Sequence, residues 1–272
     1  MTDRSRSMNI TLVGYGRMGK EVEAAAQERG HSIVSKVDPR GGTFAELSPA
    51  ALRNSSGIIE FAHPEGILPR ISLAAEYQIP YVIGTTGWDS GGQFSKEVKA
   101  IAEKKNAAVL IGSNFSVGAN LFFRIAEAAA TAINAFPDYD IAVSESHHRK
   151  KKDSPSGTAL TIAEKILNAN GRKNRICAEP LQREIAEYEL HISSLRAGSI
   201  PGIHRVILDS SADSIVLEHN ARGRSGFAAG AVLALEWLRK QERRNKRGFY
   251  TVDDFFTAIL ELENHTSDSA RE

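Results

Sequence analysis

Short apolar runs alternate with segments of helical periodicity over the first part of the chain. Each run is short and continuously hydrophobic, which is typical of strands buried on both faces of a sheet. Between the runs, apolar residues recur at spacings of three, four and seven, which indicates helices with one buried face. Together these patterns predict an α/β domain with a doubly wound parallel sheet of the Rossmann type. The predicted strands are residues 9–13, 33–37, 57–62, 81–83 and 107–111.

The pattern changes after residue 116, where helices no longer separate the strands. A stripe of apolar residues from Leu121 to Ala132 predicts a long helix, and residues 139–146 alternate like a strand. Because three further strands follow one another directly, we expect a mixed or antiparallel sheet in an α+β domain. These strands are predicted at 189–195, 204–209 and 214–219, and further helices at about 155–170, 228–238 and 252–262.

This change of pattern predicts two domains, of which the first is discontinuous. We expect residues 8–116 and 226–264 to form the α/β domain, with the C-terminal helices packing back onto it. Residues 117–225 are predicted to form the second domain. The polar ends, 1–7 and 265–272, are predicted to be mobile tails.

Composition narrows the function classes. The 272 residues include 34 Lys+Arg and 33 Asp+Glu, a formal net charge of +1 that predicts no general attraction to nucleic acid. No apolar run approaches the roughly 20 residues of a membrane span. The single cysteine, Cys177, cannot form an internal disulfide, and no Cys/His cluster has the spacing of a metal site. Since residues 1–7 lack an apolar signal region, we expect a cytoplasmic protein that binds neither nucleic acid, membrane nor metal.

A glycine-rich turn joins the first predicted strand to the first predicted helix. Its pattern, Gly14-x-Gly16-x-x-Gly19, allows a tight turn, backbone approach to a pyrophosphate and close helix packing. Asp38 ends the next strand, where a carboxylate can accept hydrogen bonds from an adenosine ribose. The motif predicts an NADH or NADPH site; a turn needed only for packing is the alternative. Asp38 would repel a 2′-phosphate, whereas nearby cations could offset it, so the choice between the two cofactors stays open. These cations are Arg17, Lys36 and Arg40.

A second turn of small residues, Gly84-Thr85-Thr86-Gly87, follows the strand at 81–83. In open α/β sheets, ligands bind at the carboxyl ends of the strands. Small residues there would let a nicotinamide ribose lie against the backbone. An ordinary tight turn is the alternative.

The segment from Glu145 to Ala159 carries the most distinctive chemistry. Two histidines, His147 and His148, can relay protons near neutral pH, and the basic residues after them suit a polyanionic substrate. The residues 156–158 (Ser-Gly-Thr) open a predicted helix, whose N-terminus can hold a carboxylate or phosphate. A solvated basic turn, or a nucleic-acid patch, is the alternative. The position between two regular elements in a charge-balanced chain favours an active site.

Several motifs together resemble the 4-hydroxy-tetrahydrodipicolinate reductase (dihydrodipicolinate reductase) family. The Glu-x-His-His-x-x-Lys-x-Asp-x-Pro-Ser-Gly-Thr-Ala segment is the most specific of them. The others occur in family order over almost the whole chain. They are Gly14-Tyr15-Gly16-Arg17-Met18-Gly19, Gly84-Thr85-Thr86-Gly87, Ser113-Asn114-Phe115-Ser116-Val117-Gly118, Arg196-x-Gly198-x-x-x-Gly202-x-His204 and Phe227-Ala228-x-Gly230-Ala231.

The resemblance implies an enzyme that reduces 4-hydroxy-tetrahydrodipicolinate to tetrahydrodipicolinate with NADH or NADPH and loss of water, in lysine and diaminopimelate biosynthesis. It implies that the first domain binds the dinucleotide, and that the second binds the small dicarboxylate substrate and builds a homotetramer. His147 would be the general acid/base and Lys151 the proton donor, although the sequence does not separate their roles. Substrate would be held by His148, Ser156, Gly157 and Thr158. The cofactor would be lined by Gly14, Tyr15, Gly16, Arg17, Met18, Asp38, Gly84, Thr85, Thr86, Gly112, Ser113, Asn114 and Phe115.

One segment departs from the family. Where members commonly have Asp-Phe-Ser/Thr-x-Pro, this chain has Glu60-Phe61-Ala62-His63-Pro64, so a hydroxyl on the cofactor side is missing. This departure leaves open another nicotinamide-dependent reductase of a small dicarboxylate or imine. Because a fold does not fix a function, a non-catalytic nucleotide sensor on the same fold stays open as well.

Overall fold

The computed structural model describes residues 7–86 and 92–268, and these form two compact units. One unit contains the described residues of 1–116 and 224–272, and the other contains Val117–Gly223. The assignment of cofactor binding to the first and of substrate binding and oligomerisation to the second stays a prediction. The expected tails at 1–6 and 269–272, and Gly87, lie outside the described residues. The last helix continues to Asp268, four residues into the range expected to be a tail. No helix in the described part is long and apolar enough to cross a bilayer.

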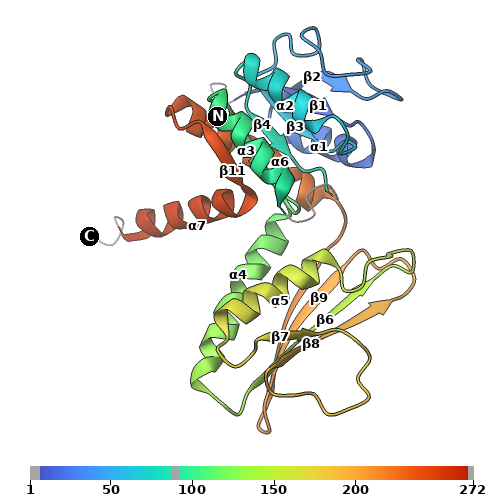
Figure 1. Cartoon of the computed structure of the whole chain (residues 1–272), viewed down its shortest axis with the longest axis vertical. Helices are drawn as coiled ribbons and strands as arrows, with labels where there is room; N and C mark the ends of the chain where they lie inside the picture. Colours follow the sequence, from blue (N-terminus) through green and yellow to red (C-terminus); the bar gives the residue numbers. More distant parts are fainter. Residues whose placement is uncertain (1–6, 87–91, 269–272) are drawn as a thin grey trace. The chain divides into compact units, whose positions relative to one another are not determined.

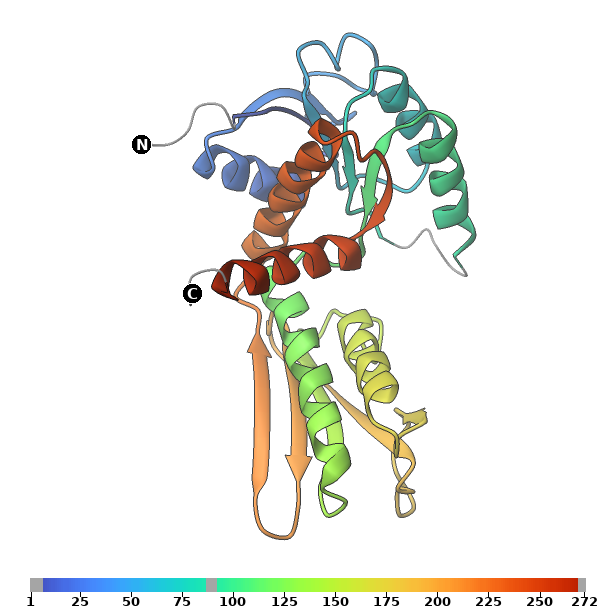
Figure 2. The same ribbon diagram turned by 90° about the vertical axis from the view of Figure 1, so that its left-hand side faces the viewer.

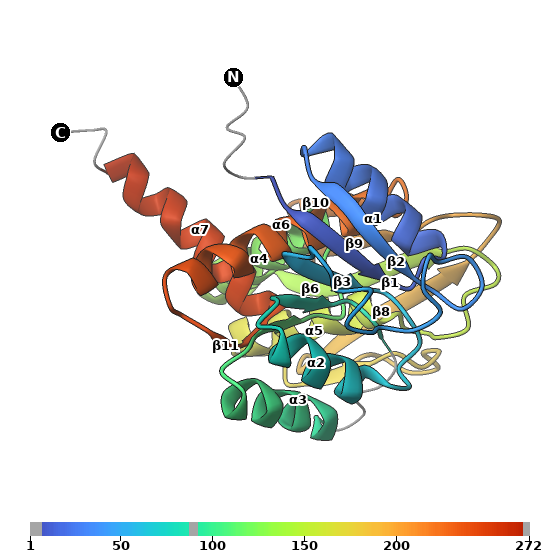
Figure 3. The same ribbon diagram turned by 90° about the horizontal axis from the view of Figure 1, so that it is seen from above.

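The first unit is built on a six-stranded parallel sheet in the order β11-β5-β4-β3-β1-β2 (Figure 1). Helices α2 and α3 pack on one face, and α1 and α6 lie together on the other (Figure 3). This arrangement confirms the doubly wound sheet. The strands are β1 Asn9–Val13, β2 Ser32–Val37, β3 Gly57–Glu60, β4 Tyr81–Ile83, β5 Ala108–Ile111 and β11 Gly248–Thr251; the helices are α1 Arg17–Glu28, α2 Ile67–Glu76, α3 Gln93–Lys104, α6 Ser225–Arg243 and α7 Val252–Asp268.

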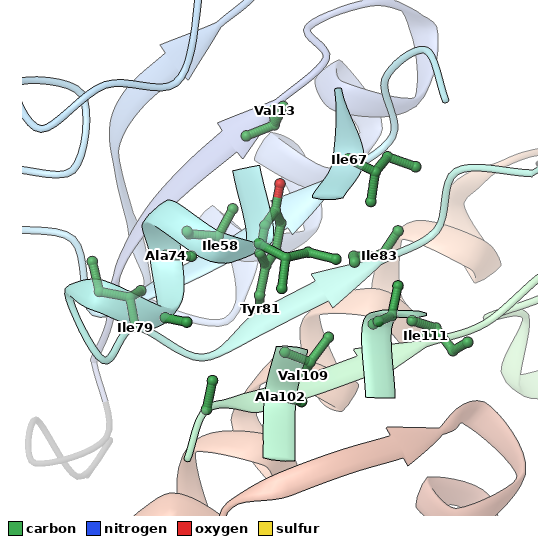
Figure 4. Packing of buried hydrophobic residues seen from close by; sticks show 14 of the residues in the cluster. Val13, Ile58, Ile67, Ala74, Ile79, Tyr81, Ile83, Ala102, Val109 and Ile111 are labelled. Carbon is green, nitrogen blue, oxygen red and sulfur yellow. The ribbon is translucent and has the colours of Figure 1, made fainter. Parts of the chain in front are cut away.

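The core between this sheet and α2 and α3 is made of alternate strand residues (Figure 4). Ile58, Tyr81 and Val109 come from neighbouring strands, and Ala74 and Ala102 from the helices. Because the strands are buried on both faces, their sequences are continuously apolar, as the pattern predicted.

The second unit is built on a five-stranded mixed sheet in the order β10-β9-β6-β8-β7. The pairs β10–β9 and β9–β6 are antiparallel, whereas β6–β8 and β8–β7 are parallel, which confirms the predicted mixed sheet. Helices α4 and α5 cover one face, and α4 lies beside the β9–β10 hairpin (Figure 2). The elements are α4 Val117–Ala132, the 3₁₀ turn η2 Ile133–Ala135, β6 Asp140–His147, α5 Gly157–Ala169, β7 Arg175–Cys177, β8 Glu189–Arg196, β9 Ile203–Asp209 and β10 Ser214–Asn220.

Two strands were not predicted from the sequence, and one was predicted too long. The strands β7 (Arg-Ile-Cys) and β11 (Gly-Phe-Tyr-Thr) are short and lack a continuous apolar run, and they form by pairing with β8 and β5. The predicted strand 57–62 ends at Glu60, since Phe61 and Ala62 already belong to the following loop.

Candidate active site

The glycine turn after β1 packs closely against the backbone at Phe61 and against itself. Gly14 has a φ of +87°, and a Cβ there would lie 2.3 Å from the carbonyl oxygen of Phe61. A Cβ at Gly19 would lie 2.3 Å from the carbonyl oxygen of Gly14. Gly16 instead borders open space and begins α1 without a side-chain cap. The turn therefore leaves the helix N-terminus accessible to an anion, as a dinucleotide phosphate site requires.

Asp38 follows β2 and faces this turn. Its carboxylate accepts hydrogen bonds from the backbone N–H groups of Arg40 and Tyr15, both at 2.8 Å. These two bonds lower the pKa of Asp38, so the group is ionised at neutral pH. An ionised carboxylate here can accept from ribose hydroxyls and repels a phosphate.

Lys36, one of the cations that could offset Asp38, is held by other groups. Its Nζ lies 2.8 Å from Glu23 and 2.9 Å from the hydroxyl of Tyr15, which itself bonds Glu23. The hydrogen bond to Glu23 raises the pKa of Lys36 and lowers that of Glu23 against the effect of burial. The charge of Lys36 is thereby neutralised within this network.

A pocket of about 870 Å³ lies beside the turn, within the volume range of small-molecule sites. Among the predicted residues, Gly14, Gly16 and Asp38 line it. Most of the other lining residues stand in no sequence motif, and they reach the pocket from the loops after β2 and β3 and from α2. They include Pro39, Leu47, His63, Pro69, Arg70 and Leu73.

The remaining predicted cofactor residues lie at the same carboxyl edge of the sheet but do not line this pocket. Residues 84–86 follow β4 and residues 112–115 follow β5, while Arg17 and Met18 begin α1. Thr85 Oγ1 accepts a hydrogen bond of 3.1 Å from the N–H of Ala62, and Phe115 packs edge-on against Phe61. Residues 61–62, in the segment that differs from the family pattern, thus contact two of the predicted cofactor segments.

In the Val117–Gly223 unit, a row of polar residues crosses several neighbouring strands of the sheet. The row lies on the same face as the apolar core residues of these strands. Glu145 on β6 lies opposite His204 on β9 and Ser194 on β8, and His219 on β10 lies opposite His204. His147 follows two residues after Glu145 on the same face. His219 stands in no sequence motif, and only the strand register shows that it extends this row.

Glu145 is the centre of the row and is buried. Its Oε1 accepts hydrogen bonds from Ser156 N–H (3.1 Å), Ser194 Oγ (2.7 Å) and Arg196 Nη2 (2.7 Å). Its Oε2 lies 2.7 Å from Nδ1 of His147. Burial alone would raise the pKa of Glu145, but these contacts lower it to about 2. The carboxylate is therefore ionised at any physiological pH.

The two buried histidines of this cluster are neutral near pH 7. Burial is the largest cause that lowers the pKa of His147, and it lowers that of His204 to about 4. The two rings meet edge-on at 5.1 Å, and Nε2 of His204 lies 3.3 Å from Oγ of Ser156.

The basic turn after β6 and the start of α5 carry the other predicted residues. Lys151 pairs with Asp153 at 2.9 Å, and the carbonyl of Asp153 accepts a bond of 2.6 Å from Arg196. His148 opens the turn and is half-buried. Ser156 caps α5 by accepting from Ala159 N–H at 3.2 Å, and Gly157 and Thr158 are the first helical residues. The turn, the helix N-terminus and His147 are thus joined through Arg196 and Glu145.

Glu145, His147 and His204 are also residue types that bind transition metals, and their ligand atoms lie within 4.8 Å of one another. The contacts favour a direct contact between the ionised carboxylate and a neutral imidazole instead. Oε2 and Nδ1 are 2.7 Å apart, closer than the about 3.3 Å between two ligands of one tetrahedral zinc ion, and Arg196 already neutralises the carboxylate.

Known proteins resemble this chain over nearly its whole length. The family model for the N-terminus of dihydrodipicolinate reductase matches residues 8–115, and that for its C-terminus matches residues 118–256. The 4-hydroxy-tetrahydrodipicolinate reductase of Christiangramia forsetii is 36% identical over 253 residues, which cover 93% of this chain and 99% of that protein. That of Chromobacterium violaceum is 34% identical over 271 residues, covering 91% and 98%.

The fold resembles that of solved structures as well. A dipicolinate-bound dihydrodipicolinate reductase from Paenisporosarcina sp. TG-14 superimposes with a TM-score of 0.70 at 19% identity, over 90% of this chain and 97% of that one. A probable dehydrogenase from Thermotoga maritima gives 0.58 at 10% identity, over 93% and 94%. At such identities these structures show a shared fold. The family models and the sequence relatives show more: the chain belongs to the dihydrodipicolinate reductase family.

Proposed function

We propose that this protein is an NAD(P)H-dependent 4-hydroxy-tetrahydrodipicolinate reductase of lysine and diaminopimelate biosynthesis. In a chain of this family, the observation that carries the proposal is the joining of His147 to the N-terminus of α5 through the buried Glu145. The net reaction consumes the 4-hydroxy ring acid, a hydride and a proton, and it yields tetrahydrodipicolinate and water.

The first unit fits a nicotinamide dinucleotide. The open space at Gly16, the uncapped N-terminus of α1 and the ionised Asp38 provide places for a pyrophosphate and a ribose. The adjoining pocket has apolar walls suited to a purine. When bound, the reduced nicotinamide would supply the hydride; the loops after β4 and β5 are the segments we assign to that end of the cofactor.

The second unit supplies the groups that a dicarboxylate needs. The first turn of α5 directs backbone N–H groups and the positive end of the helix dipole outward, and Ser156 begins it. Lys151 and His148, in the adjoining turn, add positive charge or hydrogen-bond donors. We assign the substrate carboxylates to these groups.

Protonation of the ring carbon after hydride addition requires a donor at the same place. The Lys151 ammonium carries a transferable proton and is held 2.9 Å from Asp153, on the surface of the turn. His147 is neutral and can accept a proton or a hydrogen bond. These states favour Lys151 as the donor and His147 as the group that orients or relays.

We further propose a homotetramer that forms through the face of the second sheet not covered by α4 and α5. The support is an apolar strip on that face: Leu195 and Val216 are about half exposed, and Ile207 lies opposite Val216. Light scattering should show a tetramer, and Val216→Lys should shift it to smaller species. Leu121→Lys, at an exposed site on α4, should leave the assembly intact; a wild-type monomer would overturn the proposal.

The location we propose is the cytoplasm, a reducing compartment that suits the single, buried and free thiol of Cys177. Fractionation of cells with an antibody to the chain tests this location.

The activity is tested with freshly made product of dihydrodipicolinate synthase. Purified protein should consume NADH or NADPH, followed by the absorbance of the reduced nicotinamide, only when this compound is supplied. Consumption with another dicarboxylate or imine, but not with this one, would reject the proposed substrate. Tight NADH binding without turnover of any of them would indicate a sensor.

A further inference from the structure

Glu145 contacts both the N-terminus of α5 and His147 in the Val117–Gly223 unit. The function proposed above gives it no chemical role. Through Oε1 it holds the N–H of Ser156, which begins α5, and the guanidinium of Arg196, which also holds the carbonyl of Asp153. Through Oε2 it contacts His147. One buried carboxylate thus contacts the helix N-terminus and the imidazole at once.

We propose that Glu145 is a positioning residue, which holds His147 in the tautomer protonated at Nδ1 and leaves Nε2 for the substrate. It also sets the distance between this ring and the helix N-terminus that receives a carboxylate. The catalytic consequence rests on the proposed function, whereas the tautomer is a property of the protein without ligand.

The two facing atoms, Nδ1 of His147 and Oε2 of Glu145, pair with each other and, in the described part of the chain, hydrogen-bond to no other group. Nδ1 of His147 and Oε2 of Glu145 are both buried, and among the described residues neither makes a hydrogen bond that meets the usual limits of distance and angle, so their 2.7 Å approach is the contact that can satisfy both. An ionised carboxylate can only accept, so the nitrogen 2.7 Å from it must be the one that carries the proton. The opposite tautomer would place two lone pairs against each other in a buried site.

The other ring nitrogen of His147, Nε2, lies next to Gly202. A Cβ at Gly202 would lie 3.1 Å from Nε2 of His147, so glycine at this position leaves room beside that atom. His204 packs edge-on against the ring and limits its rotation. Nε2 of a neutral ring is then a hydrogen-bond acceptor, and an imidazolium formed by its protonation would be stabilised by the adjacent carboxylate.

The test is Glu145→Gln, which keeps the shape of the side chain. Its amide oxygen can still accept from Ser156 and Arg196, but its amide N–H would face Nδ1 and so favour protonation of His147 at Nε2. Nitrogen-15 NMR of the ligand-free protein should show His147 protonated at Nδ1 in the wild type and at Nε2 in the variant. The variant should lose roughly 10²–10⁴-fold in kcat, with KM for the dicarboxylate within about threefold.

Glu189→Gln is the matched control. Glu189 is also buried on the same sheet, has a pKa lowered to about 2, and pairs with Arg183 instead of a histidine. This variant should lose stability but keep both the His147 tautomer and kcat.

The outcomes separate the two proposals. A wild-type His147 protonated at Nε2 overturns the inference, and that measurement stands even if the Glu145 variant does not fold. So does an unchanged kcat in a folded Glu145→Gln protein that turns over its substrate. A tautomer that switches as stated, in a protein that never reduces the dicarboxylate, supports the positioning role and rejects the proposed function.

Discussion

Arg70 of α2 donates hydrogen bonds to both carboxylate oxygens of Glu60 at the end of β3, from Nη2 to Oε1 at 2.5 Å and from Nε to Oε2 at 3.1 Å. Glu60 is fully buried and also accepts from the hydroxyl of Tyr81. The same guanidinium donates to the carbonyls of Glu65 and His63. The Arg70–Glu60 pair therefore links the loop at 63–65, beside the pocket, to the buried end of β3.

Removal of Arg70 should cost stability and nucleotide affinity together. Arg70→Met leaves the Glu60 carboxylate buried without its cation, and we expect a loss of roughly 3–5 kcal/mol in urea unfolding. KM for NADH should rise, because the loop is released. The double variant with Glu60→Gln should regain part of the loss, since no unpaired charge remains. Purely additive losses would show that the two side chains do not act as a pair.

Cofactor choice should favour NADH. Asp38 is ionised and Lys36 is occupied by Glu23 and Tyr15, so neither helps to bind a 2′-phosphate. Glu23→Gln frees Lys36 and should narrow the ratio of kcat/KM for NADH to that for NADPH by about tenfold, or ~1.4 kcal/mol. Glu28→Gln, exposed on the same helix, should leave the ratio unchanged. A wild-type preference for NADPH would contradict this account.

The two proposed proton-transfer residues should affect turnover and not nucleotide binding. His147→Ala and Lys151→Ala should each lower kcat by roughly 10²–10⁴-fold. NADH binding, followed by fluorescence, should be retained, because its proposed residues belong to the other unit. Lys150→Ala, an exposed neighbour, is the control. Full activity in both alanine variants would show that the roles are wrongly assigned.

Stability should fall with acid in a window set by His204. Its pKa is about 4 in the folded protein against 6.5 for an ordinary histidine, so the unfolded chain binds more protons between these values. Stability should therefore fall from pH 6.5 to pH 4, by up to about 3 kcal/mol for this residue. Glu145, with a pKa of about 2, adds a further loss below about pH 4.5. The free energy of unfolding, measured with urea at a series of pH values, should depend less steeply on pH above pH 4.5 in His204→Gln than in the wild type. An equal dependence on pH would contradict the assignment to His204.

Much of the fold could be predicted because its evidence is local. The buried parallel strands are continuously apolar, and a helix such as α1 shows one apolar face, with Val22 and Ala26 buried. The strands β7 and β11 could not be predicted, since their few residues become strands only by pairing with β8 and β5.

The candidate site likewise has a part that could be predicted from the sequence and a part that could not. The glycine turn, His147, Lys151 and Ser156 stand in short motifs whose residue types already indicate their chemistry. The contacts of Arg196 and Arg70 could not be predicted, because each reaches a carboxylate on a distant strand or at a strand end.

The sequence by itself determined most of the element types, the two-part organisation, the family and the candidate proton-transfer residues, since these depend on short motifs and on local patterns that occur along the chain. Only the tertiary structure decided which polar groups share a buried environment. Strand register places Glu145 opposite His204, and helix packing brings Arg70 to Glu60. The charge state of such groups depends on burial and on partners far away in sequence, and no local pattern encodes those distances.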